Sequence, residues 1–140
     1  MWKNKKLNYL SIVLVQLMLV FIGFKRFFVA PMDQMLCNIY DGFKNYLTFH
    51  AYVQQEEMST IYHQMNYPFG DFISFTDNTP ILAGAYKALT IIFPALAQYD
   101  LVFFNFFCLA GIIFTAIILL KLFKLLEIPL IIAFPFAIIL

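Results

Sequence analysis

Charged residues are scarce in this 140-residue sequence: they make up 12% of it, whereas soluble domains average about 25%. Nine basic and eight acidic residues leave a net charge of +1, which excludes the strongly basic surface of a nucleic-acid-binding protein. Hydrophobic residues reach 63% and include 18 Phe and 8 Tyr, more apolar surface than a small soluble core can bury. This composition excludes a disordered chain and a cytosolic enzyme, and it predicts an integral membrane protein.

Cysteine, histidine and glycine are also few, and their positions exclude several kinds of site. Cys37 and Cys108 fall in segments of different composition, one polar and one apolar, so no disulfide framework is expected. His50 and His63 lack the spacing and partners of a zinc site. The sequence has no Gly-rich phosphate loop and no nucleophile elbow.

Long hydrophobic runs predict an all-α membrane protein with two full transmembrane helices. Residues 1–24 form an N-terminal anchor whose apolar part reaches about 27 Å, and Lys25-Arg26 replaces the cleavage site that a signal peptide needs. Residues 101–120 form a second, uncharged span. After a cytoplasmic turn at 121–127, residues 128–140 resemble the start of a third, incomplete span. We therefore expect the N-terminal part of a larger polytopic protein.

The segment between the spans, residues 25–100, differs in charge from the rest of the chain. It contains seven of the eight acidic residues and only four basic ones, which gives it a net charge of −3 against +4 elsewhere. By the positive-inside rule, the N-terminus is cytoplasmic and this loop lies outside, in a periplasm, a lumen or the medium.

Two amphipathic helices are expected in this outer loop. Between Leu36 and Tyr62, residues of an apolar stripe recur with helical spacing: Leu36, Ile39, Tyr40, Phe43, Tyr46, Leu47, His50 and Ala51. The polar residues share the opposite face: Asp41, Lys44, Asn45 and Thr48. Such an aromatic stripe is typical of a helix at the headgroup boundary or against other spans. A second helix should begin at Pro80, with Thr79 as its N-cap, and run to about Phe93, where Pro94 ends it. A central Lys87 would cost about 2.5–3.5 kcal/mol in the bilayer, so this helix is not expected to span it.

The outer-loop carboxylates are the residues that chemistry could use. Asp41 lies on the first amphipathic helix, with Lys44 and Asn45 three and four residues later, where they could pair with it. The simpler interpretation is that Asp41 and Lys44 form a surface ion pair on a solvated helix face. Asp71 and Asp77 lie in turn-like sequences, where Asp commonly bonds the local backbone.

Two motifs resemble a known class of enzyme. YDGFKNY, which contains Asp41, follows the first anchor, and NYPFGDFISFTDNTP precedes the return span. Together, over residues 1–125, they are similar to the start of GT-C-fold membrane glycosyltransferases, especially bacterial membrane proteins with DG-x-KN and YP-x-G-(D/E)-x-x-x-x-TD-x-x-P motifs. The resemblance implies many spans, two amphipathic helices in the first outer loop, and a bacterial inner-membrane location.

The resemblance also implies a reaction and a set of site residues. Such enzymes transfer a sugar from a polyprenyl-phosphate donor, and a loop carboxylate helps the acceptor hydroxyl to attack. Asp41 would be that carboxylate, as general base or as ligand of Mg²⁺ or Mn²⁺. Lys44 and Asn45 would orient it or contact the phosphate, and Asp71 and Asp77 would line the pocket. The sequence departs from many GT-C members, because Gly42 follows Asp41 where they have a second acidic residue.

Two other functions fit the same residues. A non-catalytic polytopic protein, such as a transporter or flippase-like component, would use the outer helices for packing. A small membrane scaffold subunit would bind its partner through the small residues near Gly111. For every one of these functions the bilayer is an expected partner and nucleic acid is not. For the enzyme, the lipid-linked sugar donor and the remaining spans of the same protein are also expected partners.

Overall fold

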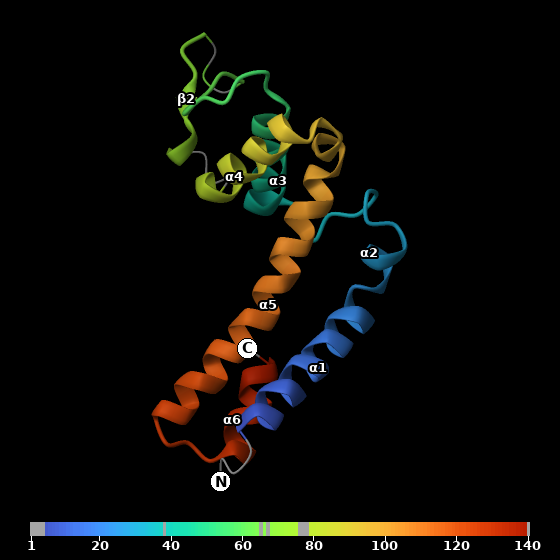
Figure 1. Ribbon diagram of the computed structural model, residues 1–140, viewed down its shortest axis with the longest axis vertical. Coiled ribbons are helices and arrows are strands. Elements are labelled where there is room, and N and C mark those ends of the chain that lie inside the picture. Colours follow the sequence, from blue (N-terminus) through green and yellow to red (C-terminus); the bar gives the residue numbers. More distant parts are fainter. Residues whose placement is uncertain (1–4, 38, 65, 67, 76–78, 140) are drawn as a thin grey trace. The chain divides into compact units, whose positions relative to one another are not determined.

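The computed structural model describes residues 5–37, 39–64, 66, 68–75 and 79–139 (Figure 1). The chain divides into two compact units. One lies within residues 1–31 and 106–140, and the other lies within residues 32–105. Helix α5 (Asp100–Leu125) is continuous, and its residues up to Asn105 belong to the second unit.

The first unit consists of helices: α1 (Lys5–Gly23), the short α2 (Lys25–Val29), most of α5, and α6 (Leu130–Ile139). Side chains from α1, α5 and α6 form its core, which comprises Ile12, Ala116, Leu120, Ala133 and Ala137. Gln16 of α1 is buried, and its Nε2 donates to the carbonyl of Ile138 at 3.0 Å. This bond satisfies a backbone acceptor in the last turn of α6, which has no partner within its own helix.

The second unit contains α3 (Tyr40–Gln54), α4 (Pro80–Ile92) and the first turns of α5. Short elements connect them: strands β1 (Ile61–Tyr62) and β2 (Asp71–Phe72), and 3₁₀ helices η1 (Ile73–Phe75) and η2 (Pro94–Tyr99). The strands pair antiparallel, with Ile61 opposite Phe72.

Aromatic rings form the core of the second unit. Phe49 of α3 is fully buried, and its ring centroid lies 4.8 Å from that of Phe104 in α5. Tyr86 of α4 stacks on Phe103 at 4.3 Å. Three helices are thereby joined through one cluster, which explains why α3 and α4 are ordered although each is too short to be stable alone.

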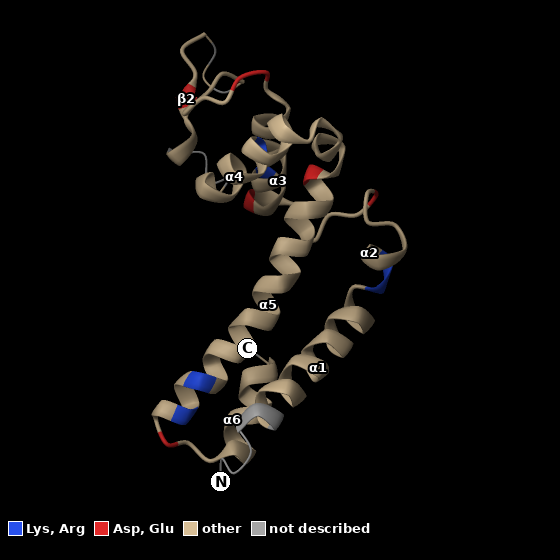
Figure 2. Ribbon diagram, in the orientation of Figure 1, with Lys and Arg blue, Asp and Glu red and all other residues tan. Residues whose placement is uncertain are grey.

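The predicted helical class is confirmed, with the β1–β2 hairpin as a small exception that the sequence did not indicate. Among the described residues, one helical run, Pro94–Leu125, is long and apolar enough to cross a membrane. Figure 2 shows that charged residues lie only toward the ends of α5. The other apolar helices, Asn8–Gly23, Pro80–Ile92 and Leu130–Ile139, are shorter.

Both expected outer-loop helices are present, but α3 is shorter than the predicted stretch from Leu36 to Tyr62, because Gln55 is extended and Ile61–Tyr62 pair with β2. The buried faces of the two helices also differ from a simple apolar stripe. In α3, the expected apolar stripe is divided. Tyr46 is buried, whereas Tyr40, Phe43 and Leu47 are 89%, 44% and 53% exposed. Thr48, which was expected on the polar face, is buried, and its Oγ1 donates to the Lys44 carbonyl at 2.9 Å. The aromatic core decides this difference, since it draws in the face of α3 that carries Phe49.

The segment before α3 is held by a buried hydrogen-bonded group. Asn105 of α5 is fully buried, and its Oδ1 accepts a hydrogen bond from the Tyr46 hydroxyl. Its Nδ2 donates to the Gln34 carbonyl at 2.9 Å, and the Leu36 N–H donates to the Tyr46 hydroxyl at 3.2 Å. Because these donors and acceptors are paired with one another away from water, they fix the position of the segment that leads into α3.

We predict that Asn105→Leu lowers the free energy of unfolding by about 1–3 kcal/mol, since it leaves the Gln34 carbonyl without its donor. Thermal unfolding of the purified protein in detergent measures the effect. Thr115→Ala is the control, because the exposed Thr115 hydroxyl bonds only the Gly111 carbonyl of its own helix. Tyr46→Phe should lower the free energy of unfolding less in the Asn105→Leu background than in the wild-type protein. Strictly additive effects of the two substitutions would contradict an energetic coupling between Tyr46 and Asn105.

Candidate functional site

Asp41 lies in the first turn of α3 and is exposed. The free backbone N–H groups at a helix N-terminus, together with the helix dipole, favour a carboxylate there. Tyr40, directly before it, has a φ of 50°, in the left-handed region that aromatic residues rarely adopt. This conformation costs about 1–3 kcal/mol and is characteristic of functional sites.

Lys44 and Asn45 lie within one turn of Asp41, as the sequence predicted. Both residues are half-buried. The Oδ1 atom of Asn45 is buried and has no hydrogen-bond partner among the described residues. The first two turns of α3 therefore carry a carboxylate, an ammonium group and an amide.

Gly42 is required by a close backbone approach. A Cβ atom at this position would lie 2.2 Å from Sγ and 2.5 Å from Cβ of Cys37. Both distances are too short for any side chain, so the Asp-Gly pair in the YDGFKNY motif has a packing reason. The segment containing Cys37 lies against the same turn that carries Asp41.

Asp71 lies elsewhere in the second unit, on β2 and opposite Tyr62. Its Oδ1 accepts from the Phe72 N–H at 2.8 Å, and its Oδ2 accepts from Asn66 Nδ2 at 3.4 Å. These are the local bonds that Asp makes in turns. Asp77 lies outside the described residues.

Asp71 and Asp41 are associated with opposite ends of α3. The loop after the C-terminal end of α3 leads into β1, and Gln54 lines the same hollow as His63, directly after β1. Asp41 lies thirteen residues before Gln54, a distance of about 20 Å along the helix. Asp41, Lys44 and Asn45 thus lie at the N-terminal end of α3, whereas Asp71 is associated with its C-terminal end.

A carboxylate–imidazole pair was missed by the sequence-based argument. Asp100, in the first turn of α5, is 1% exposed, and its Oδ2 lies 2.7 Å from Nδ1 of His50. Gln54 Nε2 donates to the same oxygen at 3.1 Å, and the Leu101 N–H donates to Oδ1 at 2.6 Å. The available signal was that His50 lies on the largely apolar face of the predicted helix, where an imidazole requires a hydrogen-bonding partner.

This pair lies away from Asp41. Nine residues separate Asp41 from His50, which places them about 13 Å apart along α3 and half a turn apart around it. The two groups therefore cannot act on one reacting atom. The pair joins α3 to the start of α5, and Asp100 together with burial raises the pKa of the Tyr86 hydroxyl, burial being the larger cause.

Lys87 is buried between α4 and α3. Its Nζ donates to the carbonyl of Val53 at 2.8 Å and also to the carbonyl of Gln55. These carbonyls lie at the C-terminal end of α3, where the helix leaves acceptors unpaired and favours a positive charge. Burial lowers the pKa of the Lys87 ammonium group.

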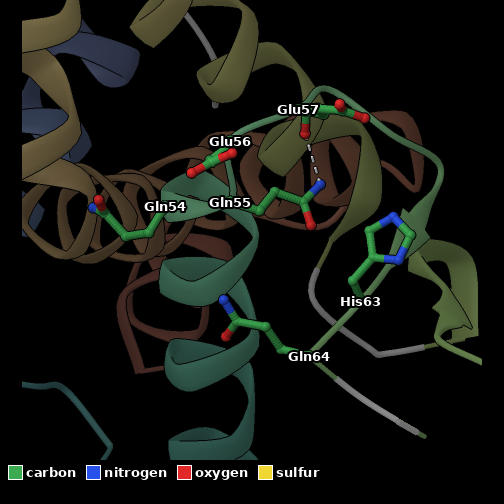
Figure 3. Close-up of a pocket in the computed structure, with 6 residues that line it drawn as sticks. All are labelled: Gln54, Gln55, Glu56, Glu57, His63 and Gln64. Atoms are coloured by element: carbon green, nitrogen blue, oxygen red, sulfur yellow. Dashed lines mark hydrogen bonds between the residues drawn. The ribbon is translucent and has the colours of Figure 1, made fainter. Parts of the chain in front are cut away.

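An open hollow of about 390 Å³ lies beyond the C-terminal end of α3 (Figure 3). Figure 3 shows Gln55 bonded to the Glu57 carbonyl, a contact of 3.0 Å. The lining consists of carboxamides, carboxylates and one imidazole: Gln54, Gln55, Glu56, Glu57, His63 and Gln64. Among the described residues, this lining has two carboxylates and no lysine or arginine, so it does not favour a phosphate.

The described residues do not form a metal site. Among them, no three His, Cys, Asp or Glu side chains lie close enough together to hold an ion. Asp41 provides one carboxylate beside Lys44, whose positive charge opposes a cation. The Mg²⁺ or Mn²⁺ implied by the resemblance is therefore not supported by this donor set.

We predict that Gly42→Ala destabilises the protein by about 1–3 kcal/mol, because the new methyl group must displace Cys37 or the turn itself. Gly84→Ala is the matched control. No atom lies within 4 Å of its added Cβ, and the change from Gly to Ala inside helix α4 should stabilise by up to about 1 kcal/mol. Equal effects of the two substitutions on thermal unfolding would contradict the close approach at Gly42.

Lys87 should make stability depend on pH. The lowered pKa of folded Lys87 means that the unfolded chain binds more protons between that value and 10.5. The free energy of unfolding therefore increases as the pH is raised through this window. Burial raises the pKa of Tyr52, Tyr62 and Tyr86 above 10.0, which opposes the trend only at higher pH.

Denaturant titrations from neutral pH up to pH 10 measure this dependence, and Lys87→Met should reduce its slope. An unchanged slope in Lys87→Met would assign the effect to other groups.

Comparison with known proteins identifies a family but no characterised relative. No curated protein and no solved structure matches the chain. Residues 12–140 match the family described as a domain of unknown function, DUF6311. This range includes α3, α4 and α5, and it includes the five residues that the motifs indicated: Asp41, Lys44, Asn45, Asp71 and Asp77. The chain therefore belongs to the DUF6311 family.

Proposed function

We propose that this chain is the N-terminal segment of an integral membrane glycosyltransferase, and that Asp41 is its general base. The proposed enzyme transfers a sugar from a polyprenyl-phosphate donor to an acceptor hydroxyl on the outer face of the membrane. The observation that carries the proposal is the position of Asp41, an exposed carboxylate at a helix start that is surrounded by exposed apolar side chains.

The surroundings of Asp41 suit a substrate with a lipid tail. Ile39, Tyr40 and Phe43 are 59%, 89% and 44% exposed. Apolar and aromatic side chains exposed around a charged group are typical of a headgroup boundary. A polyprenyl-phosphate sugar presents its reacting carbon at that depth, with its chain in the hydrocarbon and its phosphate at the surface.

The packing of α3 supports the same depth. Its buried face contacts Phe103 and Phe104 of α5, which belong to the apolar run that is long enough to cross a membrane. In the proposed enzyme, α3 therefore lies where this run leaves the bilayer. The segment within residues 32–105 is then on the outer side, which agrees with its acidic balance and with a cytoplasmic N-terminus.

The chemistry requires only a base near the acceptor hydroxyl. The Asp41 carboxylate accepts the hydroxyl proton while the acceptor oxygen bonds to the anomeric carbon. The bond from that carbon to the phosphate oxygen breaks, and polyprenyl phosphate leaves with the electron pair. Lys44, one turn away, supports the charge of the leaving phosphate, and Asn45 orients the Asp41 carboxylate.

We predict that Asp41→Asn abolishes sugar transfer without changing the amount of protein in the membrane, because Asn keeps the shape of the side chain but cannot accept the proton. Membranes that contain the product of the full reading frame would be supplied with undecaprenyl-phosphate-linked hexoses, and labelled transfer would be measured. Asp33→Asn is the matched control, since Asp33 is also an exposed carboxylate of the same unit.

Retained transfer in Asp41→Asn would exclude its role as base. Absence of transfer by the wild-type protein with every donor would favour the non-catalytic alternative, a transporter or flippase-like component.

A further inference from the structure

Helix α4 has its polar residues inside and its apolar residues outside. The face that packs on α3 and α5 carries Lys87 and Thr90, which are 6% and 7% exposed. Each is satisfied by backbone oxygen, Lys87 at the Val53 carbonyl and Thr90 at the Lys87 carbonyl, 2.8 Å away in both cases. A helix on the surface of a water-soluble domain has the opposite arrangement.

The outward face of α4 is an uninterrupted apolar stripe. Ile81, Leu89 and Ile92 are 89%, 44% and 67% exposed, and Ala85 between them is exposed as well. Their spacing of four, four and three residues keeps all four side chains on one side of the helix. This stripe contains no charged or hydrogen-bonding side chain, although a lysine lies in the middle of the same helix.

The position of Lys87 changes what α4 can contact. From the sequence, a central lysine argues against contact between this helix and the bilayer. In the structure its ammonium group is bound to carbonyls at the end of α3 and faces away from the stripe. The desolvation of the charge is thus compensated inside the unit, and the stripe meets its surroundings as a purely apolar surface.

We propose that the α4 stripe, formed by Ile81, Ala85, Leu89 and Ile92, is a contact surface for the acyl chains of one membrane leaflet. From Ile81 to Ile92 the stripe extends about 16 Å, which is too short to cross a hydrocarbon core of about 30 Å. Helix α4 also packs, through Tyr86, on Phe103 of the apolar run that is long enough to cross a membrane. This inference goes beyond sugar transfer and does not depend on it.

Nitroxide accessibility in vesicles tests the proposal. Leu89→Cys and Ile92→Cys, in a Cys37→Ala/Cys108→Ala background, would be labelled and reconstituted with phosphatidylethanolamine and phosphatidylglycerol. Both labels should show oxygen accessibility several-fold above, and accessibility to a water-soluble nickel chelate several-fold below, the values at Glu56→Cys. Glu56 is the control because it is an exposed polar residue of the same unit.

Nickel accessibility at Leu89 equal to that at Glu56 would place the stripe in water and overturn the proposal. Low accessibility to both reagents would also overturn it, because a protein surface would then cover the stripe, either another helix or a second copy. If labelling disturbs folding, Leu89→Trp in a Trp2→Phe background gives the same decision. Brominated lipids should quench its fluorescence, and unquenched emission would exclude acyl contact.

Discussion

The second unit depends on polar side chains buried in the first turns of α5. Asp100 binds His50 and Gln54 of α3, and Asn105 binds Tyr46 of α3. Buried polar groups are costly unless every partner is present, so these bonds restrict α3 to one register on α5. The aromatic cluster around Phe49 supplies apolar contact area, but such contacts are less directional. The direction of α3, and with it the position of Asp41, follows from the polar bonds.

Helix α4 shows how a lysine can belong to an apolar surface. The C-terminal end of α3 leaves carbonyl groups without partners, and the Lys87 ammonium group binds two of them. The contact therefore provides hydrogen-bonding partners for the buried ammonium group and for the free carbonyls at the helix end. It also keeps the ammonium group off the outer surface of α4. The remaining surface of α4 is apolar because its polar residues are used internally, as the proposed acyl contact requires.

Helix α3 separates two different chemical environments. Its N-terminal end carries Asp41 among exposed apolar side chains, and its C-terminal end borders a hollow lined by amides and carboxylates such as Gln54 and Glu56. For a membrane glycosyltransferase, the first environment suits a lipid-linked donor. Family membership extends over nearly the whole chain, so these features can be compared directly in other members of the DUF6311 family.

Composition and periodicity were sufficient to predict the helices, because helix formation depends on neighbours within one or two turns. They also identified Pro80 as the first residue of α4. Long-range pairing could not be derived in this way. The contact of His50 with Asp100 joins residues fifty apart, and the inward direction of Lys87 depends on the carbonyls of a different helix. Hydrophobic spacing defines the faces of a helix, but only the packing of α3, α4 and α5 decided which face became the interior, because buried polar groups require specific partners.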